Sequence, residues 1–439
     1  MEDLTVLVIG AGAREHVISE AYENSNLVKR IIVAPGNSFT AIGRKKEVVV
    51  DGNCNLRDPH SILKLAEKYI PDTDSPHLID VAQDDALALG AVDTLQKYGF
   101  NSFGPGRNGA KLESDKSFSK RFMFRNGIPT SPFGIFTGVG GVRSKIYIER
   151  LFREDSGKVV YVKASGLCGG KGALKAAGRE ETKKRIKQMK DFGKAGRTFL
   201  IEEALEGEEF SYFAISDGKN YRAFKSAQDY KRVLDKNKGE QTGGMGAVSP
   251  AKVTERIDAE IREKLVERAV NGNPYPGIIY VGGIDKDRKK NPFCIEYNVR
   301  WGDPEAQVVL PGIQTDYAEL VQTAIDGRLN EIDLIQDDLT RVCVVGAAKG
   351  YPENSSQAKG KEIFGLREAM KLPGIKVYGA GINVQDGRFY VGENPGRLFS
   401  IVGKGNLKEA TDMAYDAMEM ISIEGDNLHF RKDVGAGRS

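Results

Sequence analysis

A short polar pattern near the end of an apolar segment offers ligands for a metal ion. Glu296 and Asn298 are two positions apart, and Arg300 continues the same spacing. Because side chains alternate along a strand, these three would share one face. A carboxylate and an amide oxygen suit Mg²⁺, which usually adds the phosphates of a nucleotide to a few such ligands. The pattern therefore favours a metal–phosphate site over a solvated edge strand, the alternative for the same residues.

A glycine-rich turn is the second feature with chemical potential. The turn Gly166–Gly172 contains four glycines and Lys171. It comes shortly after Lys163, the last residue of an expected strand over 159–163. Glycines let backbone N–H groups approach phosphate oxygens, and lysines supply positive charge. The spacing differs from a Walker A loop, and no Ser or Thr follows Lys171. Together with Lys116 upstream, the turn predicts phosphate binding, with a plain flexible hairpin as the alternative.

A glycine turn near the N-terminus is a further candidate phosphate site. Gly10, Gly12 and Arg14 lie where an expected strand over 5–10 leads into a helix over 13–24. The N–H groups and dipole of a helix N-terminus favour an anion. The third glycine of the dinucleotide fingerprint is missing, and no acidic residue ends a second strand, so evidence for a nicotinamide site is weak. A simple tight turn is the alternative.

Three other polar stretches flank these motifs. The segment 201–209 is rich in Glu and follows an expected strand over 198–203. An adenine amino group and ribose hydroxyls need acceptors of this kind, although a solvated charged turn is the default for such a run. The loops 226–232 and 242–250 add a mixed-charge run and a second glycine turn.

The elements that must position these residues follow an α/β order. Apolar strand-like segments occur at 5–10, 30–34, 46–50, 77–82 and 101–103, with helical patterns at 59–70 and 85–98 between some of them. That alternation predicts a doubly wound parallel sheet ending near residue 104. Strand-rich sequence then covers 210–250 and 277–300, and residues 331–439 predict a separate strand-and-turn unit. Further helices are expected at 115–126, 180–191, 254–270, 316–327 and 407–422.

Composition narrows the function classes. The chain has 439 residues, which predicts two to four domains. Its net charge of +3, from 64 basic and 61 acidic residues, gives no support for a nucleic-acid or membrane-surface partner. Four scattered cysteines predict neither a disulfide framework nor a zinc site. No apolar run is long enough for a membrane span, and the acidic start differs from a signal peptide, so we expect a cytoplasmic protein.

Taken together, the motifs resemble the phosphoribosylamine–glycine ligases, which are ATP-grasp enzymes of purine synthesis. The resemblance covers nearly the whole chain, and the order of its motifs is highly specific. The matching stretches are Val8–His16, Ala34–Asn37, Gln228–Arg232, Thr242–Gly246, Glu296–Glu305 and Phe430–Gly435. The resemblance implies an ATP-grasp fold with an N-terminal doubly wound domain and a small C-terminal β-rich domain.

The implied domain boundaries divide the chain into four units. These are an N-terminal substrate-binding domain (1–104), a central catalytic domain (105–123 and 192–330), a small lid (124–191) and a C-terminal domain (331–439). The lid and its 166–172 loop should close over the reacting groups, because an acyl phosphate would otherwise hydrolyse.

The resemblance also implies a role for individual residues. Those that match ATP contacts are Lys116, Lys163, Gly169, Gly170, Lys171, Gly172, the adenine hinge at Glu202, Glu203 and Leu205, and Glu209 at the ribose. Glu296 and Asn298 match ligands of Mg²⁺ or Mn²⁺. Those that match the glycine and phosphoribosylamine side are Asp229, Lys231, Arg232, Gly243, Gly244 and Asp303, with Gly10, Gly12, Arg14, Gly36 and Asn37 at the sugar phosphate. Arg300, Lys171 and Asp229 are implied to be catalytic.

The chain departs from the family pattern at three places. The family usually has Gly-Pro-Glu where this chain has Ala82-Gln83-Asp84, so contacts to the amine substrate should differ there. Cys168 replaces a usual alanine in the phosphate loop, and we assign it no redox role. Trp301 replaces a usual phenylalanine and keeps an aromatic ring.

The implied reaction joins glycine to 5-phosphoribosylamine with ATP through glycyl phosphate, giving glycinamide ribonucleotide, ADP and phosphate. The only partners expected are these small molecules, and we expect a monomer. Two alternatives remain: another ATP-grasp carboxylate–amine ligase, and a non-catalytic nucleotide sensor. The interpretation as a dehydrogenase would depend only on Gly10 and Gly12. Glycine-dependent release of ADP would separate these functions.

Overall fold

The N-terminal region is a five-stranded parallel sheet in the order β3-β2-β1-β4-β5. The computed structural model describes residues 3–436. The strands are β1 (Leu4–Gly10), β2 (Val28–Pro35), β3 (Glu47–Val50), β4 (His77–Val81) and β5 (Ser102–Phe103), and the helices are α1 (Ala13–Glu23), α2 (Pro59–Tyr69), α3 (Asp84–Leu89) and α4 (Ala91–Lys97). The predicted doubly wound sheet is confirmed, because its buried apolar runs form adjacent strands.

The helix expected over 85–98 is wrong in one respect: it is two helices, α3 and α4. Gly90 separates them with φ near +84°, a left-handed conformation that glycine adopts without the cost of a Cβ. The break lets the chain turn between two short helices instead of running on as one.

Two helices lead from the N-terminal sheet to the rest of the molecule. These are α5 (Arg107–Ser114) and α6 (Lys116–Arg125). The Asp115 carboxylate accepts hydrogen bonds from the backbone N–H groups of Ser117 and Phe118, so it caps α6 and fixes where the helix starts. The N–H of Lys116 donates to the carbonyl of Ser165, 2.8 Å away. The start of α6 is therefore held against the start of the glycine-rich loop.

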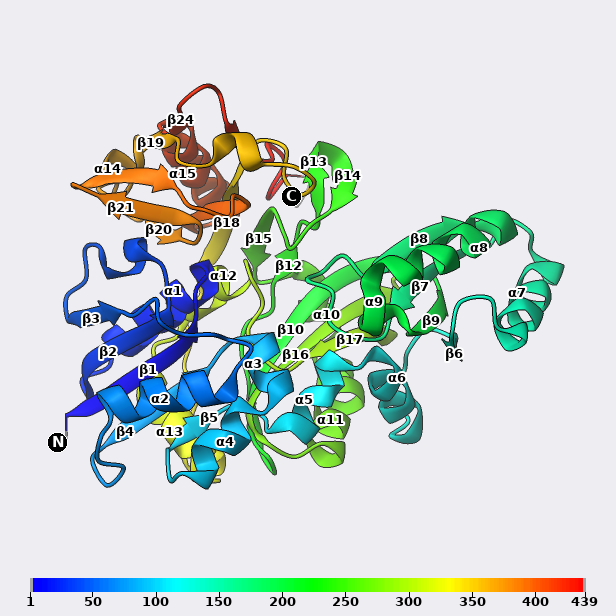
Figure 1. The fold of residues 1–439 in the computed structure, drawn as a ribbon, viewed down its shortest axis with the longest axis horizontal. Coiled ribbons are helices and arrows are strands. Elements are labelled where there is room, and N and C mark those ends of the chain that lie inside the picture. The colour runs from blue at the N-terminus through cyan, green and yellow to red at the C-terminus, as the bar shows by residue number, and fades with distance from the viewer. Residues whose placement is uncertain (1–2, 437–439) are drawn as a thin grey trace.

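The lid is a four-stranded antiparallel sheet in the order β6-β9-β7-β8, and it projects to one side of the molecule (Figure 1). Its elements are β6 (Phe133–Thr137), α7 (Val142–Glu154), β7 (Val159–Ala164), β8 (Ala173–Ala177), α8 (Gly178–Gln188), η2 (Met189–Phe192), α9 (Gly193–Gly196) and β9 (Thr198–Glu203). It has its own hydrophobic core. The sheet includes β9, which the division at residue 191 assigns to the central domain; the exact domain boundaries remain a prediction.

The central sheet is antiparallel, in the order β11-β10-β16-β17. Its strands are β10 (Gly207–Asp217), β11 (Tyr221–Ala223), β16 (Pro276–Lys286) and β17 (Pro292–Asn298). The helical segments of this region are α10 (Lys252–Ile261), η4 (Arg262–Glu267), α11 (Arg268–Gly272), α12 (Ala306–Val309), η5 (Leu310–Gly312), α13 (Tyr317–Ile325) and η6 (Leu329–Glu331). The helix expected over 254–270 is present with a π-helical segment, η4, in its middle.

The C-terminal unit is less separate than the sequence predicts. Its main sheet runs β12-β15-β18-β23-β20, and two of these strands, β12 (Gln228–Asp229) and β15 (Gly246–Ser249), come from the central region. The others are β18 (Thr340–Ala348), β20 (Lys376–Gly379), β23 (Arg397–Gly405) and the short β25 (Leu428–His429). Helix α15 (Leu407–Glu419) packs against β18 and β23. The shared sheet ties both central loops, 226–232 and 242–250, to the C-terminal unit.

The remaining short elements complete the architecture. They are η1 (Ser38–Ala41), the hairpin β13 (Arg232–Leu234) and β14 (Lys238–Gln241) with η3 (Asp235–Asn237) between them, η7 (Ser356–Ala358), α14 (Leu366–Ala369) and a second C-terminal sheet of β21 (Ile382–Gln385), β22 (Arg388–Val391), β19 (Glu362–Phe364) and β24 (Ser422–Ile423). Within residues 3–436, no helix combines the length and apolar character needed to cross a membrane.

Candidate active site

Two adjoining cavities lie where the lid sheet meets the central sheet. The larger has a volume of about 430 Å³, and the smaller, about 20 Å³, opens beside the start of α6. Predicted residues lining the larger cavity are Lys163, Glu202, Glu203, Leu205, Glu209, Asp229, Lys231, Arg232 and Glu296. Lys116, Lys163, Glu202, Glu296 and Asn298 line the smaller one. The structure therefore gathers most of the predicted ATP and metal residues at one place.

Glu296 stands at the centre of a group of cations. Burial alone would raise the pKa of this carboxyl, but four positive side chains lower it overall. In order of effect they are Lys116, Lys231, Lys163 and Arg300. Glu296 is therefore ionised at neutral pH. It shares one face of β17 with Asn298, as the strand spacing predicts.

Arg300 is held at the end of β17 by three acceptors, one of which is the carbonyl of Trp301, 2.9 Å from its Nη1. It forms an ion pair with Glu113 at 2.7 Å, and its Nη2 donates to Oδ1 of Asn298 at 3.3 Å. Burial would lower the pKa of Arg300, but Glu113 and other anions raise it above its ordinary value. Glu113 in turn accepts from the N–H of Val299 at 2.9 Å. Sequence reasoning missed Glu113, because only the fold brings α5 to the end of β17.

The side chain of Glu202 takes part in buried ion pairs, which the sequence did not predict. Its Oε2 lies 2.9 Å from Nζ of Lys163 and 3.1 Å from Nζ of Lys120, and Ser131 donates to the same oxygen. Burial would raise its pKa, but the two lysines bring the pKa of Glu202 down to about 2. Oε2 of Glu202 thus orients Lys163 and Lys120, whereas its Oε1 has no hydrogen-bond partner among the described residues, and the adenine-hinge role of Glu202 stays a prediction. Lys120 was missed, although it lies one helical turn after Lys116 on α6.

The predicted adenine hinge is the connection between the two sheets. Residues 204–206 link β9 of the lid to β10 of the central sheet. Glu203 pairs with Lys158 at 3.0 Å, so its carboxylate also serves an ion pair. Leu205 and the exposed Glu209 face the larger cavity. The location fits a base-binding hinge, and the individual contacts remain predictions.

Lys171 lies apart from the other lysines. It is exposed, lines neither cavity, and points its Nζ toward the carbonyl of Pro352 in the C-terminal unit at 3.4 Å. Gly169 and Gly170 have open space around them, whereas Gly172 closes the loop against Cys168. Burial raises the pKa of the Cys168 thiol, which agrees with a packing role. Lys171 is therefore not among the lysines around Glu296, and its contact with phosphate stays a prediction.

The residues predicted to bind glycine and phosphoribosylamine near the central sheet, called the amine side below, fall into two groups. Asp229 and Lys231 pair at 3.6 Å inside the larger cavity, where burial raises the pKa of Asp229 and Lys231 partly offsets that rise. Asp229 raises the pKa of Lys231, so the lysine stays charged. Arg232 donates to the carbonyl of Gly239 at 3.0 Å. The second group, Asp303 with Gly243 and Gly244, contacts Arg397 of the C-terminal unit.

The two N-terminal turns meet at the carboxyl edge of the parallel sheet. The N–H of Gly36 donates to the carbonyl of Gly10 at 2.9 Å, and Asn37 donates to the Ala11 carbonyl at 2.8 Å. Glu15, however, occupies the start of α1, where it accepts from the N–H of Gly12 at 2.7 Å. The two turns thus lie together, with an acidic side chain bound to the N–H of Gly12, and their role in holding a sugar phosphate stays a prediction.

Arg14 is engaged by neighbours as well. It pairs with Glu15 at 2.6 Å and donates to Oε1 of Gln83 at 2.6 Å. Gln83 then donates to Asp84 at 2.9 Å, and Asp84 lies near enough to Arg300 to raise its pKa. The Ala82–Asp84 segment, which stands where the family usually has Gly-Pro-Glu, therefore links Arg14 of the N-terminal turn to Arg300 at the end of β17.

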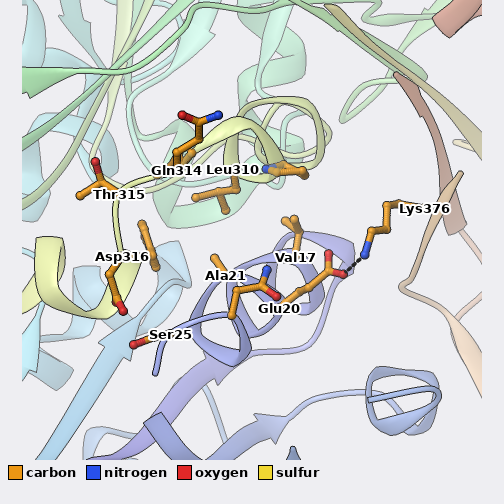
Figure 2. A pocket seen from close by; sticks show the side chains of 13 residues that line it. Val17, Glu20, Ala21, Ser25, Leu310, Gln314, Thr315, Asp316 and Lys376 are labelled. Carbon is orange, nitrogen blue, oxygen red and sulfur yellow. Dashed lines mark hydrogen bonds and ion pairs between the residues drawn. The ribbon is translucent and has the colours of Figure 1, made fainter. Parts of the chain in front are cut away.

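A third hollow, of about 160 Å³, lies outside this site. It is bounded by α1, the segment 310–317 and Lys376 of β20, and Figure 2 shows Glu20 and Lys376 paired across its edge. None of the predicted site residues lines it.

Comparison with known proteins assigns the whole chain to one family. Three domain models of phosphoribosylglycinamide synthetase match it: the N domain at 4–113, the ATP-grasp (A) domain at 114–306 and the C domain at 341–437. The phosphoribosylamine–glycine ligase of Vibrio parahaemolyticus is 38% identical over 445 residues, covering 98% of this chain and 98% of that protein.

The chain belongs to the phosphoribosylamine–glycine ligase family.

Other members and structures agree with this assignment. The phosphoribosylamine–glycine ligase of Caldanaerobacter subterraneus is 35% identical over 99% of this chain and 100% of that protein. The human trifunctional purine biosynthetic protein adenosine-3 is 37% identical over 98% of this chain, which spans 41% of that longer protein. A solved phosphoribosylamine–glycine ligase from Thermotoga maritima has a TM-score of 0.76 and 28% identity, covering 98% of this chain and 99% of that one.

A more distant neighbour supports the fold alone. The biotin carboxylase domain of a 2-oxoglutarate carboxylase from Hydrogenobacter thermophilus, solved with MgADP and bicarbonate, has a TM-score of 0.70 at 18% identity, covering 97% of this chain and 91% of that one. The predicted ATP-grasp fold of this family member is confirmed.

Two further side chains from the 296–305 motif of this ligase-family chain are buried. Glu305 is buried, and its Oε1 accepts from the hydroxyl of Tyr280 at 2.6 Å and from Ser211 at 3.1 Å. Trp301, the substituted aromatic, stacks on Phe213 with ring centroids 5.2 Å apart. Glu305 ends the motif that begins at Glu296, which is the only signal in the sequence that pointed to it.

Proposed function

We propose that the chain catalyses the ATP-dependent ligation of glycine to 5-phosphoribosylamine, giving glycinamide ribonucleotide, ADP and phosphate in de novo purine synthesis. Membership of the family over nearly the full length supports the substrates. The observation that carries the chemistry is the cluster of four cations around Glu296. Such a cluster neutralises charge on a transferred phosphoryl group.

The first step activates glycine. One carboxylate oxygen of glycine attacks the γ-phosphorus of ATP, the bond from that phosphorus to the β–γ bridging oxygen breaks, and ADP leaves. Lys116, Lys163 and Arg300, whose positive charges act on Glu296, are suited to offset the charge on the phosphoryl oxygens. Glu202 keeps Lys163 in position before the nucleotide arrives.

The residues present suit a divalent cation. Glu296, with an ionised carboxylate, and Asn298, with an amide oxygen on the same face of β17, would hold Mg²⁺ or Mn²⁺, because such ions prefer oxygen ligands. A metal ion held there would add further neutralisation of phosphate charge.

The second step forms the amide bond. The nitrogen of phosphoribosylamine attacks the acyl carbon of glycyl phosphate, the bond from that carbon to the phosphate oxygen breaks, and inorganic phosphate leaves. The nitrogen then loses a proton. Asp229 is suited to accept it, because burial raises its pKa toward neutrality. No covalent acyl-enzyme is needed, so a cysteine or histidine nucleophile plays no part.

Oxygen transfer gives the decisive test. If glycine labelled with ¹⁸O in its carboxylate is used, one labelled oxygen must appear in the released phosphate. Phosphate without label would exclude the acyl-phosphate route. ADP release should also depend on glycine, which separates this ligase from a nucleotide sensor, and on phosphoribosylamine, which separates it from other ATP-grasp ligases.

Trapping offers an independent check on the intermediate. Enzyme, Mg·ATP, glycine and hydroxylamine without phosphoribosylamine should yield glycine hydroxamate together with ADP. An unreactive sugar phosphate that fills the N-terminal turns should increase the yield by favouring closure of the lid. The cytoplasmic location and the monomeric state remain predictions, and sedimentation velocity would measure the second.

A further inference from the structure

Arg397, the first residue of β23 in the C-terminal unit, reaches both parts of the predicted amine side. Its Nη1 donates to the carbonyl of Gly243 at 3.1 Å and to that of Asp303 at 2.7 Å. Its Nη2 lies 3.1 Å from Oδ2 of the Asp303 carboxylate, while Nη1 lies 3.3 Å from Oδ1. One guanidinium therefore holds a backbone turn and a carboxylate in a fixed relation.

The turn that Arg397 holds has little freedom of its own. Gly244 has a φ of +117°, and a Cβ added there would meet Pro304 at 2.5 Å. Nη1 of Arg397 also lies 3.4 Å from the Gly244 carbonyl. On the other side of the turn, the N–H of Gly243 donates to the hydroxyl of Tyr351 at 3.2 Å. Arg397 and Tyr351, both from the C-terminal unit, therefore form hydrogen bonds to opposite sides of the 243–244 turn.

The held groups face the N-terminal turn. A Cβ placed on Gly12 would lie 3.5 Å from Oδ2 of Asp303, so the carboxylate borders the predicted sugar-phosphate position. Gln307 donates to Oδ1 of Asp303 at 2.8 Å, and the Asp303 side chain remains 20% exposed. Burial would lower the pKa of Arg397, but Asp303, with smaller contributions from Tyr351 and Glu305, raises that pKa overall, so the guanidinium keeps its charge.

We propose that Arg397, assisted by Tyr351, is a positioning residue that sets the 243–244 turn and Asp303 for the phosphoribosylamine substrate. This inference rests on the proposed function. It gives the C-terminal unit a specific role, because that unit then fixes the amine side of the site while ATP binds between the lid and the central sheet. Loss of the guanidinium geometry should therefore weaken sugar-phosphate binding and leave nucleotide binding largely unchanged.

Arg397→Lys is the direct test, because lysine keeps the charge but cannot form the same fork of contacts. Calorimetric affinity for glycinamide ribonucleotide should fall about tenfold or more, and KM for phosphoribosylamine should rise similarly, while Mg·ADP affinity changes less than about twofold. Arg388→Lys is the matched control: Arg388 also begins a strand of the C-terminal unit, but it is exposed and lies 3.7 Å from Glu362.

Tyr351→Phe provides a second variant that removes only the hydroxyl at Gly243. It should change product affinity in the same direction by a smaller factor. Product affinity equal to wild type in Arg397→Lys, or an equal loss of product and Mg·ADP affinity with a lower Tm, would overturn the positioning role. If Arg397→Lys does not fold, an unchanged product affinity in Tyr351→Phe overturns it. Wild-type enzyme that neither binds product nor shows glycine-dependent ADP release would refute the proposed function, and the inference with it.

Discussion

Lys163 and Glu202 form a buried ion pair, with 2.9 Å between Nζ and Oε2, at the point where the two cavities adjoin. The same oxygen lies 3.1 Å from Lys120, so one carboxylate fixes two cations. Their positions are therefore set before any phosphate arrives, which reduces the reorganisation that binding would otherwise require.

Glu202→Gln should lower the free energy of unfolding by about 3–5 kcal/mol, because it leaves two buried lysines without their anion. Affinity for ATP should fall as well, since Lys163 loses its support. Urea unfolding and nucleotide titration measure the two effects. Glu203→Gln is the matched control for stability: its pair with Lys158 is more exposed and should cost at most about 1 kcal/mol. Equal stability of the two variants would contradict the role of Glu202.

Glu296→Gln should nearly abolish turnover while the protein stays folded. Glutamine has almost the same shape, but it lacks the charge that faces four cations and would hold the metal. ADP release across a Mg²⁺ titration, with thermal unfolding in parallel, checks both statements. Activity close to wild type at ordinary Mg²⁺ would remove Glu296 from the metal site.

Lys171→Ala should raise KM for ATP and lower kcat. The ratio kcat/KM should therefore fall by about tenfold, which corresponds to the loss of one charge-assisted hydrogen bond. Stability should hardly change, because Lys171 is exposed and its contact with Pro352 is a single 3.4 Å hydrogen bond. Lys175→Ala, an exposed lysine on β8, is the control. Unchanged ATP kinetics in Lys171→Ala would identify the loop as a plain hairpin.

ATP should also protect the 166–172 loop from protease in the wild-type protein. The loop has open space around Gly169 and Gly170, so it is accessible until the lid closes. Limited proteolysis with and without Mg·ATP measures this, and cleavage at equal rates would argue against a moving lid.

Asp80 should make stability fall as pH rises from about 4 to about 7. Burial raises its pKa to about 7, although a hydrogen bond from Tyr22 opposes the rise. Across that window the folded state keeps a proton that the unfolded state has lost, so raising the pH favours unfolding. The difference in unfolding free energy between wild type and Asp80→Asn should therefore change with pH. A difference that stays constant from pH 4 to 8 would contradict the buried titration.

Local regularities in the sequence were enough to predict much of the secondary structure, the N-terminal sheet and the family of this protein. Strand alternation placed Glu296 and Asn298 on one face, because that period is a property of the backbone. Alternating apolar strands and helices predicted the parallel N-terminal sheet, and the helix expected over 115–126 is present as α6. The ordered motifs identified the family, and with it the nucleotide and the reaction.

Tertiary structure decided which charges meet and what each one does. Glu202 is a partner of two lysines because packing desolvates all three groups together, and burial is not visible in a local pattern. Arg397 and Asp303 are 94 positions apart, so only a sheet shared between the central and C-terminal units brings them into contact. Lys171 stands away from the phosphate cluster because its loop belongs to the lid, whose position depends on contacts far from its own sequence.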